Sequence, residues 1–252
     1  MWKFIRMFSA LVVLASTAGA QQFWDKKPYE KWSRDECRRL LEESPWVQKY
    51  AISAPVFAAR GGRAGVQADR TGTDVTAIGG AGEQEITYTA QLRTALPMRR
   101  AVVQQALLAA AKQGASVEQM QAMRTRAEQF VNSPTNDIVI VHIIYGSNNV
   151  NDDRALARYW QEQTVEKVKD IFSLIGANGR RVAPLRYEAL PGGGREFAVT
   201  FPRLADGQAL VTAQDKTLAF EFTHPAIGTD KATKVLVQYQ VKDMVRGEEV
   251  VY

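Results

Sequence analysis

Two histidines are the residues of this sequence best suited to acid–base chemistry. His142 lies within the apolar run IVIVHIIY at 138–145, so burial is expected. A buried histidine is either an acid–base group or a neutral core residue with one hydrogen-bonded partner, and the second interpretation is favoured. His224 precedes Pro225, which indicates a strand end or a turn.

Ser147 is the serine best placed to act as a nucleophile. Tyr145-Gly146-Ser147 follows a predicted buried strand and precedes a predicted helix, which is the setting of a nucleophile elbow. An elbow needs glycine two residues either side of the serine, and Tyr145 and Asn149 occupy those positions. A hydrolase of unfamiliar type using Ser147 or His142 is therefore retained only as the alternative hypothesis.

The sequence predicts no metal site and no cofactor. Zinc needs several His or Cys ligands, and His142, His224 and Cys37 do not stand at ligand spacing. The polar cluster at 148–153 lacks the ligand pattern of an EF-hand, and helix capping explains it more simply than calcium. The glycines at 192–194 precede no helical pattern, so a phosphate cradle is unsupported.

Charge and cysteine content exclude further classes. The net charge of +5 is scattered over short basic pairs rather than massed on one face, so no nucleic-acid partner is expected. Cys37 is the only cysteine, which excludes a disulfide within one chain. Its place in a helical pattern predicts a small core residue.

Residues 1–20 have the organisation of a cleavable export signal. Lys3 and Arg6 precede the uncharged apolar run at 8–15, and Ala18 and Ala20 give the small-residue pattern of a cleavage site. A transmembrane helix needs about 20 apolar residues, and this run is shorter. We therefore expect an exported protein, periplasmic or secreted, with no transmembrane segment after cleavage.

Residues 21–252 are expected to form a single α+β domain, with helices packed on a largely antiparallel sheet and a β-rich C-terminal part from about residue 182. Capping boxes at Ser33/Glu36 and Ser116/Gln119 predict two helix starts, and Pro97 predicts a third. The helix that begins after Ser116 is expected to bury Met120, Met123, Ala127, Phe130 and Val131. A longer helix is predicted over about 151–175.

Alternation of apolar and polar residues predicts the strands. Residues 47–59 and 85–94 are expected to pair as a hairpin around a flexible glycine-rich loop at about 60–82, with Gln91 and Arg93 on the polar side of the second strand. Strand 138–145 is expected to be central and covered on both faces. The C-terminal strands are predicted at 182–189, 196–201, 208–213, 217–223, 234–242 and 248–252.

Several segments together resemble an uncharacterised family of exported bacterial proteins. At the start these are Pro28-Tyr29-x-x-Trp32-Ser33 and Leu40-Leu41-x-x-Ser44-Pro45-Trp46. Phe201-Pro202-Arg203, Asp206-Gly207, Asp215-Lys216 and Val241-Lys242-Asp243-Met244-Val245 extend the similarity through the C-terminal half. The resemblance implies export and brings no activity with it.

These observations favour a non-enzymatic exported protein that acts as an envelope-associated or secreted interaction module. A protein partner in the cell envelope is expected to use the aromatic residues Phe23, Trp24, Tyr29 and Trp46. The same side chains can instead pack on the domain as a clasp, which is the preferred alternative.

Overall fold

The structure is a computed structural model, and it describes residues 23–54, 84–176, 179–190 and 194–252. Helices and antiparallel strands both contribute, and the C-terminal part is rich in strands, so the predicted α+β class is confirmed. The predicted signal at 1–20 and the predicted loop at 60–82 lie outside the described residues.

The first sheet has five strands in the order β1-β2-β3-β7-β6, and every neighbouring pair is antiparallel. Val47 opposite Gln91 begins the register of the first hairpin, which confirms the predicted pairing of these two segments. The strands are β1 (Val47–Ala54), β2 (Gln84–Leu92), β3 (Ile138–Ser147), β7 (Glu196–Pro202) and β6 (Arg186–Ala189).

The second sheet has four strands in the order β11-β10-β4-β5 and packs against the first through aromatic side chains. Tyr88 and Phe222 join the two sheets with ring centroids 4.9 Å apart, and Phe201 and Phe220 do so at 5.9 Å. The strands are β11 (Thr233–Gln240), β10 (Thr217–His224), β4 (Phe172–Ile175) and β5 (Arg181–Val182). The main core therefore lies between the sheets.

The helix predicted over about 151–175 is wrong in its second half. Helix α5 (Val150–Gln161) ends early, α6 (Val165–Val168) adds one turn, and β4 follows. Phe172 and Leu174 alternate with half-buried residues and pair with Phe222 and Phe220 of β10. Cross-strand pairing and burial at a period of two override the helical spacing, which only the second sheet makes visible.

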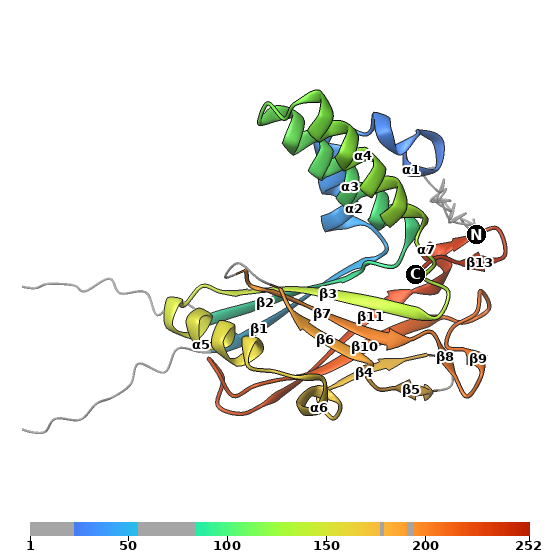
Figure 1. The fold of residues 1–252 in the computed structure, drawn as a ribbon. Helices are drawn as coiled ribbons and strands as arrows, with labels where there is room; N and C mark the ends of the chain where they lie inside the picture. Colours follow the sequence, from blue (N-terminus) through green and yellow to red (C-terminus); the bar gives the residue numbers. More distant parts are fainter. Residues whose placement is uncertain (1–22, 55–83, 177–178, 191–193) are drawn as a thin grey trace, which may run out of the picture.

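Helices α2 (Arg34–Glu43), α3 (Leu96–Lys112) and α4 (Val117–Asn132) stand on the side of the first sheet opposite β4 and β10 (Figure 1). Both predicted capping boxes, at Ser33 and Ser116, are present. The hairpin of α3 and α4 rises away from the sheets, so the predicted burial of Phe130 is wrong and its side chain is 47% exposed.

Two expectations about the first sheet need correction. Strand β3 is its middle strand as predicted, yet the outer face, meaning the face turned from the second sheet, is only partly covered, and Ile144 is 39% exposed. Gln91 belongs to the predicted polar side of β2 but is 2% exposed, because α2 covers it and Leu41 accepts a hydrogen bond from its amide.

The predicted C-terminal strands 196–201 and 217–223 are confirmed as β7 and β10, whereas the other predicted strands are shorter or divided. The segment expected as a strand over 208–213 gives only β9 (Gln208–Ala209), paired with β8 (Leu204–Ala205). Strand β11 ends at Gln240, where α7 (Val241–Met244) begins, and β12 (Val245–Arg246) pairs with β13 (Glu249–Val250). In the described parts of the chain, no helix combines the length and apolar character needed to cross a membrane.

Candidate functional site

His142 lies on the outer face of β3 and is 6% exposed. Its neighbours Val141 and Ile143 point to the opposite face and into the core, as side-chain alternation along a strand requires. Gln91 of β2 and Ala198 of β7 lie directly beside His142 in the register. The sheet therefore fixes which side chains can reach the imidazole ring.

Both ring nitrogens of His142 have polar neighbours. Nε2 lies 3.0 Å from the Glu196 carboxylate, and Nδ1 lies 3.2 Å from Arg93 Nη2. Because a guanidinium only donates, Nδ1 accepts from Arg93 and the ring proton sits on Nε2, where it is donated to Glu196. The Gln91 Oε1 atom also lies 3.2 Å from Nδ1, but with the proton on Nε2 both atoms are acceptors, so they form no hydrogen bond with each other.

Burial and the nearby Arg93 charge lower the pKa of His142 to about 3, so the ring is neutral at neutral pH. Burial also lowers the pKa of Arg93, to about 10, and the guanidinium therefore keeps its charge. The imidazole ring separates the positive Arg93 from the negative Glu196, and each charged group contacts a different ring nitrogen.

A cavity of about 590 Å³ lies above this polar group, between the outer sheet face and the helical hairpin. We call it the outer-face pocket. Its apolar lining comes from Val102 of α3, Phe130 of α4, Ile138 and Ile140 of β3, Ala198 of β7 and Leu190. Its volume falls within the range of about 300–1,000 Å³ typical of ligand sites, and a few polar groups in an apolar wall are typical of them too.

Polar groups at the rim of the pocket are largely engaged with the backbone. Arg99 Nη1 donates to the carbonyls of Phe130 and Ser133, which ties α3 to the end of α4. The Ser133 hydroxyl donates to Gln129, and the Thr94 hydroxyl accepts from Ile140. Neither hydroxyl is adjacent to a free base, so nothing here resembles an activated nucleophile.

The structure does not bring Ser147 to His142. The two residues are five positions apart on β3, so their side chains point to opposite faces and lie about 16 Å apart at about 3.3 Å per residue. The Ser147 hydroxyl accepts a hydrogen bond from the Asn149 backbone N–H, and the Ser147 backbone N–H donates to the Asp153 carboxylate.

His224 is fully buried at the end of β10 and has two partners. Its Nε2 donates to the Ile227 carbonyl at 2.9 Å, which leaves Nδ1 to accept from the Tyr88 hydroxyl at 2.6 Å. Burial lowers the pKa of His224. A neutral histidine with both nitrogens satisfied fits a structural role at the predicted strand end.

The four aromatic residues proposed for partner binding form one packed group. Trp46 is fully buried, its indole N–H donates to the Val251 carbonyl, and Phe23, Trp24 and Tyr29 are half-buried against the core. The Trp24 and Trp46 rings lie 5.8 Å apart. The half-buried rings keep part of their surface exposed.

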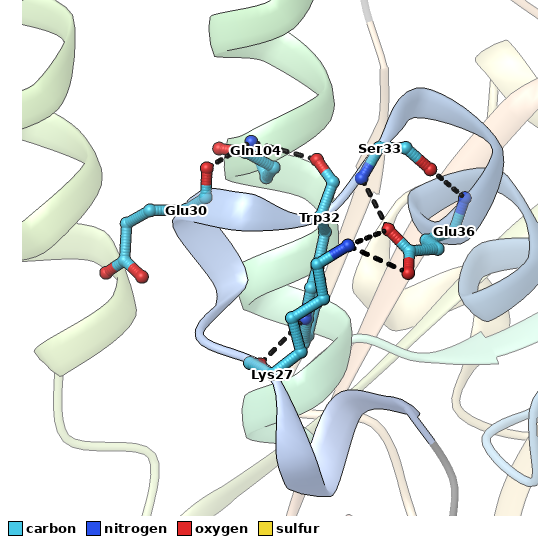
Figure 2. Close-up of polar contacts among 6 residues, drawn as sticks. All are labelled: Lys27, Glu30, Trp32, Ser33, Glu36 and Gln104. Atoms are coloured by element: carbon cyan, nitrogen blue, oxygen red, sulfur yellow. Dashed lines mark hydrogen bonds and ion pairs between the residues drawn. The ribbon is translucent and has the colours of Figure 1, made fainter.

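The segment that carries Phe23, Trp24 and Tyr29 is fixed by polar contacts (Figure 2). Lys27 pairs with both carboxylate oxygens of Glu36, and Glu36 also closes the capping box with Ser33. Gln104 of α3 donates to the carbonyls of Glu30 and Trp32, at 3.0 and 3.1 Å. Because Gln104 is buried, these hydrogen bonds hold the one-turn helix η1 (Tyr29–Lys31) against α3.

The remaining reactive candidates are inert or dispersed. Cys37 is fully buried, and burial, followed by the Glu36 charge, raises the pKa of its thiol to about 11. Within the ranges that the structure describes, no three His, Cys, Asp or Glu side chains converge as a metal ion would require.

Sequence reasoning found His142 but missed its partners Arg93 and Glu196 and its neighbour Gln91. Gln91 and Arg93 stood out as polar residues ending an alternating strand, and Glu196 begins another. Only the antiparallel register of β2, β3 and β7 assembles them, and that register is not readable from the separate segments.

These features define a class: an α+β protein with two facing antiparallel sheets, a helical hairpin, and a partly apolar pocket on the outer sheet face. No protein-family model, curated protein or solved structure matches the chain. The function is therefore argued from the site alone.

Proposed function

We propose that this chain is an exported, non-catalytic binding protein and that the outer-face pocket is its ligand site. One observation carries the proposal: the pocket has apolar walls, and the polar groups at its base already contact one another. Such an arrangement offers a preformed surface for an apolar ligand, which is the usual construction of a binding cavity.

The geometry favours binding over hydrolysis. A general base works best with a pKa near the working pH, and the His142 pKa lies far below neutrality. Ser147 points away from His142. The hydrolase alternative predicts that Ser147→Ala or His142→Ala reduces turnover of ester or amide substrates, and unchanged turnover in both variants ends it.

A neutral fluorescent probe tests the pocket. N-phenyl-1-naphthylamine brightens in apolar sites, and we expect saturable binding to the purified protein. Ala198→Phe places a ring inside the pocket and is expected to abolish that binding. Thr87→Phe adds the same ring to an exposed position on the same face of the sheet, outside the pocket, and should leave binding intact. Equal binding by both variants would place the probe elsewhere.

The proposed export is supported by the signal pattern at 1–20. Cell fractionation with N-terminal sequencing tests it: a mature protein that begins at Gln21 outside the cytoplasm is expected, and an unprocessed chain in the cytoplasm contradicts it. An envelope protein partner stays a prediction, and its test is a pulldown from an envelope fraction with wild-type and Trp24→Ala bait.

A further inference from the structure

The outer-face pocket carries more positive than negative charge. Arg93 and Arg99 both line it, and Glu196 is the one carboxylate among its described lining residues. His142 is neutral at neutral pH. The described lining of the pocket, base and rim together, therefore has a net charge of about +1, counting Arg93, Arg99 and Glu196 as charged.

Each of these two guanidinium groups has a buried donor without a partner. The Nε atoms of Arg93 and Arg99 are buried and have no hydrogen-bond partner among the described residues. The hydrogen bonds of these two side chains use Nη2 of Arg93 and Nη1 of Arg99. Because both Nε atoms are buried, a ligand in the pocket meets the exposed part of each half-buried arginine side chain instead, and the positive charge of the guanidinium favours a ligand with a negatively charged acceptor.

The rest of the lining is hydrocarbon from the helical hairpin and the sheet. Phe130 is 47% exposed although it is a large apolar side chain, and it stands at the pocket wall. A water-sized group occupies about 30 Å³ in a liquid. The pocket volume of about 590 Å³ therefore accommodates on the order of ten to twenty heavy atoms. An aliphatic chain of medium length has that size.

We propose that the outer-face pocket binds an aliphatic monocarboxylate, with the chain against Phe130, Ile138 and Ile140 and the carboxylate at Arg93. This inference rests on the proposed binding function and adds the ligand class. A carboxylate matches the planar fork of a guanidinium, and one negative charge balances the net charge of the described lining. Glu196 lies on the far side of the His142 ring, which reduces repulsion between the two carboxylates.

Three twelve-carbon probes of different head-group charge separate the ligand class from general apolar binding. Dodecanoate and dodecyltrimethylammonium are titrated into the purified protein below their micelle concentrations and dodecan-1-ol below its solubility limit, and heat is measured by calorimetry. Dodecanoate is expected to bind one-to-one and at least tenfold more tightly than the alcohol, because the alcohol lacks the charge-assisted hydrogen bond. The cation is expected to bind weakest.

Matched variants locate the head group and the chain. Arg93→Met keeps the unbranched apolar stem of the side chain and removes its charge, so dodecanoate affinity should fall at least tenfold while dodecanol affinity is retained. Arg186→Met makes the same change at an exposed arginine of β6 outside the pocket and should change neither affinity.

A second pair of variants covers the case in which Arg93→Met fails to fold. Phe130→Gln and Phe130→Glu have the same size at a half-exposed position and differ by one charge. Both should weaken all three probes, and the glutamate variant should weaken dodecanoate at least fivefold more than the glutamine variant does.

The outcomes distinguish this inference from the proposed function. Equal affinities for the three probes, lost together in Ala198→Phe, overturn the carboxylate and leave the pocket as an apolar binding site. Dodecanoate binding that is unaffected by Arg93→Met and by Phe130→Glu also overturns it. If none of the three twelve-carbon probes binds while N-phenyl-1-naphthylamine still does, the aliphatic ligand class is overturned and the proposed binding function is kept.

Discussion

Protonation of His142 should make the protein less stable as the pH falls through the range in which an exposed histidine titrates. In the unfolded chain the pKa is about 6.5, whereas burial and Arg93 lower it to about 3 in the folded protein. Between these values the unfolded state binds one more proton than the folded state. The contribution of His142 to the free energy of unfolding is therefore fully present above about pH 6.5, and it is lost progressively as the pH falls toward 3.

The magnitude follows from the pKa difference. At pH 5 the unfolded histidine is protonated and the folded one is not, so the loss is about 1.5 pH units at about 1.4 kcal/mol each, or about 2 kcal/mol. Glu196 acts in the other direction because it favours the protonated ring. About 2 kcal/mol is therefore an upper bound for the loss. The reduction caused by Glu196 is small, because its carboxylate is 39% exposed and its charge is screened by water.

The test compares urea unfolding at pH 7.5 and pH 5 for the wild type and His142→Gln. Glutamine does not titrate, and its amide can still donate to Glu196. We expect the wild type to lose about 1–2 kcal/mol more than the variant between the two pH values. His224, the other histidine, is present in both proteins, so its contribution cancels in the difference. Equal losses within about 0.5 kcal/mol would refute the argument that the folded site excludes the proton.

Three further predictions concern the fold. Cys37 should resist a thiol reagent in the native protein at pH 8 and react at once in 6 M guanidinium, because it is buried and its pKa is raised to about 11; rapid native labelling contradicts this. Gly176→Ala should lower the free energy of unfolding by about 2 kcal/mol or more, because the added Cβ would clash with the backbone carbonyl oxygen of Leu210; an unchanged urea midpoint contradicts it. Ser33→Ala should cost about 1 kcal/mol by removing the capping hydrogen bond to Glu36, measured in the same unfolding assay against Ser53→Ala on strand β1 as control, and equal costs contradict it.

Local chemistry explains why several helices could be predicted from the sequence. A capping box is complete within four residues, so Ser33 with Glu36, and Ser116 with Gln119, mark helix starts without reference to the rest of the chain. The hairpin of β1 and β2 was predictable for a similar reason, since alternation defines each strand and the two strands follow one another along the chain.

Longer-range contacts decided what local patterns left open. Phe172 and Leu174 fit a helical stripe as well as a strand, and their pairing with β10 selects the strand. Phe130 fits the buried side of α4, yet the hairpin projects away from the sheets and leaves it exposed. Spacing along the chain specifies one face of an element but not what covers that face.

The amino-acid sequence by itself determined the α+β class, the starts of α2, α3, α4 and α5, the first hairpin and the burial of His142. The tertiary structure decided that Arg93 and Glu196 contact this histidine and that Ser147 does not, because strands from three separate parts of the chain must pair in one register before their side chains meet. Residues distant in sequence share a pocket only through that register, so the candidate site is a property of the sheet.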